Sequence, residues 1–94
     1  MKIVYLPKTN SDLAWFYHYY KEIFPAEKGN AQKHYYAIES ILENNPRIGR
    51  IIYKKDIRKL EIPRTPFAFI YRINESKKMI EILRIWDERS EFEL

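Results

Sequence analysis

Residues 57 to 90 constrain the fold more than any other part of the chain, because they read as three short strands joined by two tight turns. Phe67, Phe69, Tyr71 and Ile73 alternate with smaller or charged residues, which is the period of a strand with one buried face. The predicted strands are Ile57–Ile62, Phe67–Ile73 and Met79–Trp86, with turns at Pro63–Pro66 and Asn74–Lys78. The last strand is apolar on both faces, which favours a well-covered position. The pattern predicts an antiparallel meander.

Two helical stripes precede this meander. Apolar residues recur at helical spacing from Leu13 to Phe24 and again from Ala31 to Leu42. Pro25 separates the stripes because proline disfavours the helical conformation in the residue before it. The second stripe ends at Asn44-Asn45-Pro46, where asparagine tolerates a left-handed exit from the helix and proline prevents its continuation. The two stripes therefore predict a helical hairpin.

Two shorter extended pieces complete the pattern. Lys2–Leu6 is a β-type run closed by a proline, and Ile51–Tyr53 is a short extended piece before the meander. The sequence leaves open which strand pairs with Lys2–Leu6. The predicted fold class is α+β in the order β-α-α-β-β-β, with an antiparallel sheet meander packed against an N-terminal helical hairpin.

Size and composition predict one packed domain over residues 1–94. The chain is 46% hydrophobic with only two glycines, which favours a core over disorder. It has no cysteine and two histidines, so disulfides and thiolate metal sites are excluded and we expect no cofactor. No apolar run approaches the roughly 20 residues that span a bilayer, so we expect a soluble, cytoplasmic protein. Residues 87–94 hold four acids and one arginine and are expected to form a loose tail.

Positive charge is concentrated in the second half of the chain. The net charge is +4, residues 1–46 sum to zero, and residues 47–64 hold seven basic residues against Asp56 and Glu61. Such a patch attracts nucleic acid or an acidic protein surface. A solvated basic loop and strand edge is the alternative interpretation.

The chain resembles the RelE/ParE superfamily of toxins from type II toxin–antitoxin systems, and within it the ParE-like branch. The segments that carry the resemblance are Asp12-Leu13, Asn45–Arg50, Ile57–Pro63, Thr65–Phe67, Ile70–Ile73 and Ile82–Asp87. The resemblance implies a small toxin that a cognate antitoxin holds inactive by wrapping it with a flexible segment. It also implies a toxin–antitoxin complex that can bind its operator DNA through the antitoxin.

Two activities occur in that superfamily. RelE-like members are ribosome-dependent mRNA interferases, whereas ParE-like members resemble them in fold but bind and poison DNA gyrase. The nuclease positions of RelE-type toxins fall here on Ala68, Asp87 and Glu93, and its two strand lysines fall on Lys59 and Glu61. RNA cleavage needs proton-transfer groups and positive charge at the phosphate, which an alanine and carboxylates do not supply. We therefore favour a gyrase poison without catalytic residues; the alternatives are a RelE-type interferase and a non-toxic antitoxin-binding relative.

Arginines beside an aromatic side chain suggest where a target would bind. The predicted target-binding residues are Arg58, Lys59, Arg72, Arg84, Trp86 and Arg89. Guanidinium groups pair with carboxylates or phosphates bidentately and stack on aromatic rings. The alternative is that Arg72 and Arg84 pair inside the domain with Glu81, Asp87 or Glu88.

Aromatic residues off the core stripe suggest where the antitoxin would bind. Trp15 and Tyr19 lie four residues apart on a separate face of the first helix. Together with Trp86 they form the predicted antitoxin-binding set. The alternative for Trp15 and Tyr19 is packing beneath a neighbouring element.

Overall fold

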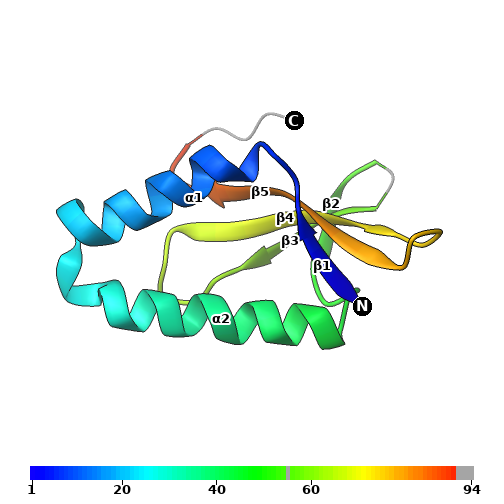
Figure 1. Ribbon diagram of the computed structural model, residues 1–94, viewed down its shortest axis with the longest axis horizontal. Coiled ribbons are helices and arrows are strands. Elements are labelled where there is room, and N and C mark those ends of the chain that lie inside the picture. The colour runs from blue at the N-terminus through cyan, green and yellow to red at the C-terminus, as the bar shows by residue number, and fades with distance from the viewer. Residues whose placement is uncertain (55, 91–94) are drawn as a thin grey trace.

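The computed structural model describes residues 1–54 and 56–90 as an α+β fold in which a helical hairpin precedes most of the sheet (Figure 1). The elements are β1 (Lys2–Tyr5), α1 (Thr9–His18), α2 (Lys28–Asn44), β2 (Arg50–Tyr53), β3 (Ile57–Glu61), β4 (Phe67–Asn74) and β5 (Met79–Asp87). A π-helical turn over Tyr19–Ile23 and a 3₁₀ turn over Pro25–Glu27 join the two helices. The predicted fold class is confirmed.

The sheet has five strands in the order β1-β5-β4-β3-β2. The antiparallel meander is present, and the extended piece Ile51–Tyr53 belongs to a further strand, β2, that pairs antiparallel with β3. The first strand pairs with the last one in parallel, with Lys2 opposite Met79 and Tyr5 opposite Ile82. The sheet is therefore mixed, and its two margins are β1 and β2.

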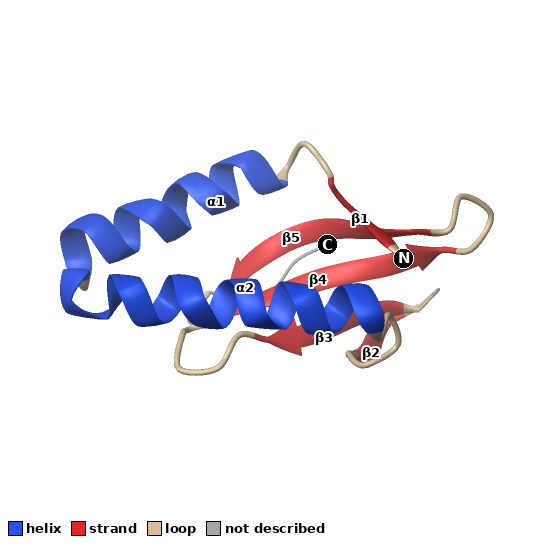
Figure 2. Ribbon diagram, turned by 60° about the horizontal axis from the view of Figure 1, so that its bottom comes forward, coloured by secondary structure: helices blue, strands red, loops and turns tan. Residues whose placement is uncertain are grey.

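The core lies between the helical hairpin and one face of the sheet. Phe16 on α1 meets Phe67 on β4 at 4.9 Å between ring centroids, and Tyr35 on α2 meets Phe69 at 5.1 Å. Figure 2 shows α2 lying across this face. Phe67, Phe69 and Tyr71 are fully buried, as the alternation in the sequence predicts, but Ala68 and Ile70 on the other face of β4 are fully buried too.

The first helical stripe does not stay buried to its end. The backbone N–H of Phe24 donates to the carbonyl of Tyr19 at 2.8 Å, which is the i to i+5 bond of a π-helical turn. That turn changes the angular phase of the side chains that follow it. Ile23 and Phe24 are consequently about half exposed, although the stripe predicts that they face the core.

A β-bulge in β5 shifts the alternation of its side chains between the two faces of the sheet. Ile70 pairs with Arg84 and Tyr71 pairs with Ile82, so Leu83 is the extra residue. Before the bulge Ile82 faces the core, and after it Ile85 does. Arg84 therefore takes the face of the sheet that the helices leave open, because it lies opposite Ile70 between two core-facing positions.

The connection from α2 to β2 is tied to the centre of the sheet. The backbone N–H of Gly49 donates to the Tyr71 hydroxyl at 2.9 Å, and this hydroxyl donates to the carbonyl of Pro46 at 2.7 Å. Arg58 donates to the carbonyl of Gly49 at 2.8 Å. A Cβ on Gly49 would lie 2.6 Å from the Tyr71 hydroxyl, so only glycine fits here.

The segment expected to be a loose tail is partly held. Asp87 ends β5, the backbone N–H of Glu88 donates to the carbonyl of Pro66 at 2.7 Å, and that of Ser90 donates to Asp87 at 3.0 Å. The rest of that segment, residues 91–94, lies outside the described residues. Over residues 1–54 and 56–90, neither helix has the length and apolar character needed to traverse a bilayer.

Candidate binding surface

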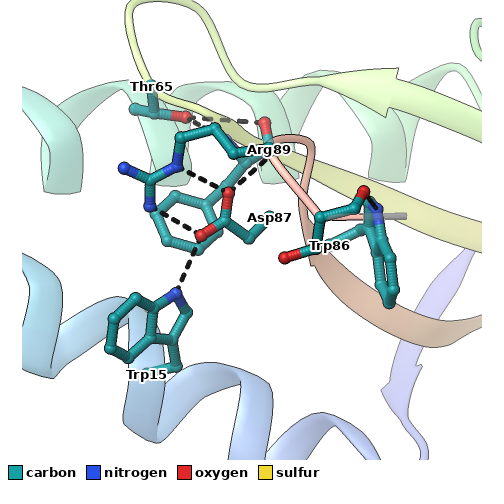
Figure 3. A network of polar contacts seen from close by, with 7 residues as sticks. Trp15, Thr65, Trp86, Asp87 and Arg89 are labelled. Carbon is teal, nitrogen blue, oxygen red and sulfur yellow. Dashed lines mark hydrogen bonds and ion pairs between the residues drawn. The ribbon is translucent and has the colours of Figure 1, made fainter. Parts of the chain in front are cut away.

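Asp87 is the centre of a polar cluster at the end of β5 (Figure 3). The Trp15 indole N–H donates to its carboxylate at 2.9 Å, and Arg89 donates to both carboxylate oxygens, at 2.8 Å and 2.6 Å. The hydrogen bonds from Arg89, reinforced by that from Trp15, lower the pKa of Asp87 to about 2. The carboxylate therefore stays ionised at neutral pH and links α1 to the turn after β5.

Trp15, Tyr19 and Arg89 lie together beside this carboxylate. The Arg89 guanidinium lies 4.5 Å from the centroid of the Tyr19 ring, and Trp15 is 40% exposed with its ring stacked on His18. Tyr19 itself is half-buried and packs edge-on against Phe67. The sequence predicts either an exposed aromatic pair or packing beneath a neighbouring element. Tyr19 is packed in this way, whereas Trp15 is exposed.

Trp86 lies beside this cluster, because it lines a cleft of about 310 Å³ together with Trp15 and Asp87. Figure 3 shows its ring turned away from Trp15. Trp86 lines a cleft of about 250 Å³ with Lys59 and Ile70, and its indole N–H donates to the carbonyl of Ser90 at 3.3 Å. The three members of the predicted antitoxin-binding set therefore lie near one another, because Trp15 packs beside Tyr19 and shares a cleft with Trp86.

Arg84 is engaged by a residue that the sequence did not suggest as its partner. Its Nε and Nη2 atoms donate to the two carboxylate oxygens of Asp12 at 2.7 Å and 2.8 Å. The carboxylate also accepts the backbone N–H of Ile85 at 3.0 Å, just beyond the point where β1 stops covering the margin of β5. Internal pairing of Arg84 is thus correct as an alternative, but its partner is none of the acids named for it. Asp12 lies in the first turn of α1, where an acidic residue is common because it interacts favourably with the helix dipole. The local sequence therefore does not indicate that Asp12 pairs with Arg84.

The remaining predicted target-binding cations also have internal partners. Arg72 pairs with Glu81 at 2.8 Å and lowers the pKa of that carboxyl, and Lys59 pairs with Glu88. Arg58 donates to backbone carbonyls of the α2–β2 connection, so its first role is structural.

Two cations of the basic patch, Arg47 and Lys59, pair with acids from elsewhere in the fold, and Arg50 pairs with Glu61 of the patch itself. Arg47 pairs with Glu75 and Arg50 pairs with Glu61. Among the described residues of the patch, Lys54 and Arg64 have no acidic side chain within ion-pair distance, and Lys55 lies outside the described part. Local charge counted along the sequence therefore overstates the positive field at this surface.

An apolar cleft crosses the open face of the sheet. It has a volume of about 560 Å³ and extends from the β1–α1 connection to the end of β2. Its lining residues are Leu6, Pro7, Lys8, Tyr53, Ile57, Arg72, Leu83 and Arg84. Three cations thus border an otherwise mostly apolar cleft, which suits a partner with both apolar and acidic side chains.

The positions where RelE-type toxins carry nuclease side chains do not converge in this structure. Ala68 is fully buried opposite Glu61, while Lys59 is bound to Glu88. Asp87 lies opposite Phe67, and its carboxylate turns toward α1. Glu93 lies outside the described residues. Within the described part, these residues cannot all contact one phosphate.

Comparison with known proteins identifies the family. A family model described as the ParE toxin of type II toxin–antitoxin system, parDE, matches residues 3–92. A solved structure described as the chromosomal ParDE TA system from P. aeruginosa is 28% identical, with a TM-score of 0.71, over 90% of this chain and 92% of that one. No curated protein matches the chain. Because the family match runs from β1 to beyond β5, the chain belongs to the ParE toxin family of type II toxin–antitoxin systems.

Proposed function

We propose that this ParE-type toxin is neutralised by a cognate antitoxin and, when free in the cytoplasm, binds and poisons DNA gyrase. The observation that supports the proposal most concerns the positions where RelE-type toxins carry their nuclease side chains. Ala68 is buried, and the Asp87 carboxylate is bound to Arg89 of the same chain. These groups supply neither a proton-transfer group nor positive charge for a phosphate, which supports action by binding over RNA cleavage.

The open face of the sheet is the proposed target surface. Arg72 and Trp86 take this face, and Lys59 lies beside Trp86 in the smaller cleft. The Arg72 side chain is 49% exposed, whereas the Glu81 side chain is only 13% exposed. Arg72 can therefore bind a carboxylate of the target through its remaining N–H groups while its Nε stays bonded to Glu81. Arg58 and Arg84 support this surface through their bonds to the α2–β2 connection and to Asp12.

The cluster of Trp15, Tyr19 and Arg89 is the proposed antitoxin surface. A half-exposed indole beside a guanidinium offers apolar contact and charge pairing within one small area. An antitoxin segment with alternating apolar and acidic residues would satisfy both groups. Trp86 would join this interface through the cleft that it shares with Trp15.

A gyrase assay tests the proposed target. Purified toxin at saturating concentration should inhibit supercoiling by gyrase and trap cleaved DNA. The Arg72→Glu variant should weaken this effect, whereas Lys33→Glu, on the exposed surface of α2, should leave it unchanged. Normal supercoiling at saturating wild-type toxin would rule out gyrase as the target.

The two alternatives give different outcomes. A RelE-type interferase would produce codon-phased cuts in ribosome-bound message, which primer extension on translated message detects. A non-toxic, antitoxin-binding relative would bind antitoxin but cause no growth arrest on induced expression.

A further inference from the structure

Five segments of the chain meet around the apolar cleft on the open face of the sheet. They are the β1–α1 connection and the strands β2, β3, β4 and β5. The apolar part of the lining consists of Leu6, Pro7, Tyr53, Ile57 and Leu83. The volume of about 560 Å³ lies within the range of about 300 to 1,000 Å³ that is usual for small-molecule sites. A cleft of this size has room for more than one inserted side chain and can hold a small molecule.

The β-bulge in β5 places two consecutive residues in this cleft. Leu83 is the extra residue of the bulge, and both Leu83 and Arg84 line the cleft. In a regular strand successive side chains point to opposite faces, so only one of the two would reach it. Bulges re-aim side chains in this way and are over-represented next to functional sites. The bulge therefore brings an apolar side chain and a guanidinium group to the same part of the open face.

The charged residues that line the cleft are all cations, namely Lys8, Arg72 and Arg84. Lys8 is exposed, and no acidic side chain of the described residues lies within ion-pair distance of it. Arg72 bonds Glu81 through its Nε atom. Arg84 bonds Asp12 through its Nε and Nη2 atoms. Both guanidinium groups have further N–H donors, so the lining is complementary to an anion.

Arg84 is held in position before any ligand arrives. Its two hydrogen bonds to Asp12 fix the guanidinium from one side, and the Trp86 ring centroid lies 5.0 Å from its Cζ atom. The Arg84 side chain is only 27% exposed. A group that is already ordered loses little conformational entropy on binding. Arg84 is therefore the cation best suited to orient the ionised end of a ligand, and the exposed Lys8 adds charge at the rim.

We propose that the cleft binds a small amphiphilic carboxylic acid, whose carboxylate pairs with Arg84 and Lys8 and whose apolar chain covers Leu83 and Ile57. A small anion alone would leave the apolar lining uncovered, and an uncharged apolar molecule would cover the cations without pairing them. A free acid carries both features in one short molecule, so it avoids the ordering of backbone that a peptide segment requires.

Titration of the purified toxin with decanoate below its micelle-forming concentration, followed by NMR, tests the binding. The amide signals of Ile57 and Leu83 should shift saturably. From hexanoate through octanoate to decanoate the Kd should fall by about fourfold for each added methylene, because each one buries more apolar surface. Acetate, which lacks the chain, and decyltrimethylammonium, which has the opposite charge, should bind at least about tenfold more weakly than decanoate. No saturable shift with decanoate, or equal affinity for the cationic amphiphile, overturns the proposal.

Matched variants locate the site. Lys8→Glu and Leu83→Gln should each raise the Kd for decanoate by about tenfold, the first through charge and the second through lost apolar contact. Lys33→Glu and Ile41→Gln, at exposed positions of α2, are the matched controls and should leave the Kd unchanged. Thermal melting shows whether each variant is folded, and Lys8→Glu is a surface change that keeps the test valid if Leu83→Gln does not fold. Equal Kd values for Lys8→Glu and Lys33→Glu overturn the assignment to this cleft.

A ligand in the cleft would also cover part of the proposed target surface, because Arg72 belongs to both. This consequence rests on the proposed function, whereas the NMR titration does not depend on it. Saturating decanoate should restore supercoiling by gyrase in the presence of toxin, with gyrase and decanoate alone as the control. Binding of decanoate without this relief overturns the overlap of the two surfaces. A toxin that binds decanoate but never inhibits gyrase overturns the proposed function and leaves the ligand site standing. A synthetic peptide of alternating acidic and apolar residues that shifts the same amides, where decanoate does not, overturns the small-molecule assignment.

Discussion

Asp12 and Arg84 stand 72 residues apart in the chain and form a bidentate ion pair, with N–O distances of 2.7 Å and 2.8 Å. The same carboxylate accepts the backbone N–H of Ile85, so it joins the start of α1 to the uncovered margin of β5. This relationship holds the helical hairpin in position against the sheet. It also keeps Trp15, one helical turn later, within reach of Asp87.

Removing the Asp12 carboxylate should destabilise the fold more than removing an exposed carboxylate. Asp12→Ala leaves a partly buried guanidinium and a buried backbone N–H without their partner, so we expect a loss of about 3 kcal/mol in the free energy of unfolding. Glu75→Ala breaks the exposed pair with Arg47 and should cost at most about 1 kcal/mol. Urea unfolding of both variants measures the difference. Equal losses would show that Asp12 has no special role.

The two glycines should respond in opposite directions to alanine. Gly49→Ala forces a methyl group against the Tyr71 hydroxyl and the carbonyl of Lys59, so we expect a loss of about 2 kcal/mol. Gly29→Ala, in the first turn of α2 with nothing within 4 Å of the new Cβ, should gain about 0.5 kcal/mol because alanine favours a helix. Thermal or urea unfolding separates the two. A Gly49→Ala variant as stable as the wild type would contradict the tight contact.

The carboxyl of Asp87 should contribute to the pH dependence of stability. Its pKa is lowered from 3.8 to about 2 by hydrogen bonds from Arg89 and Trp15. A group with a depressed pKa in the folded state stabilises the fold above its unfolded pKa, and this stabilisation is lost as the pH falls through the folded pKa. The wild type should therefore lose stability between about pH 4 and pH 2 relative to Asp87→Asn.

Unfolding free energies at pH 6, 4 and 2 provide the measurement for Asp87. The wild type and Asp87→Asn should differ most at pH 6 and converge near pH 2. The corresponding substitution of Glu75, Glu75→Gln, is the control, because this acid lies in an exposed pair and should change the pH dependence little. Parallel curves for wild type and Asp87→Asn would refute the contribution.

A buried tyrosine pair should hold β1 to α2. The hydroxyl of Tyr5 lies 2.6 Å from that of Tyr35 and also donates to Glu39. Tyr5→Phe leaves both partners with one hydrogen bond fewer in a half-buried place, so we expect a loss of about 1.5 kcal/mol. Tyr17→Phe, about half exposed, should cost less than about 0.5 kcal/mol. Urea unfolding measures both, and similar values would argue against the network.

The periodicity of apolar residues in the sequence was enough to predict most of the fold. The alternation in Phe67–Ile73 and the helical spacing of Phe16 and Tyr20 are local patterns, and both correctly identified core residues. The end of the first stripe was wrong because a π-helical turn, which hydropathy does not indicate, rotates Ile23 and Phe24 outward. The bulge at Leu83 likewise changes the faces of β5 without any break in its apolar run.

The binding surface was less accessible to sequence reasoning than the core. Aromatic and arginine residues mark it, and Trp15, Tyr19 and Arg89 do come together. The ion pairs that occupy Arg84 and Lys59 could not be predicted, because their partners, Asp12 and Glu88, are brought close by strand pairing and helix packing. Whether these surfaces bind gyrase or an antitoxin stays a prediction for the assays above.

The order of helices and strands, the apolar side of most of them and the family were determined by the sequence alone, because periodic burial and family motifs are local properties of neighbouring residues. Tertiary structure decided the parallel pairing of β1 with β5, the cleft that Trp86 shares with Trp15 and the exposed margin at β2. These features depend on contacts between segments up to about eighty residues apart, whose geometry is set by the packing of the whole domain and leaves no periodic trace in either segment.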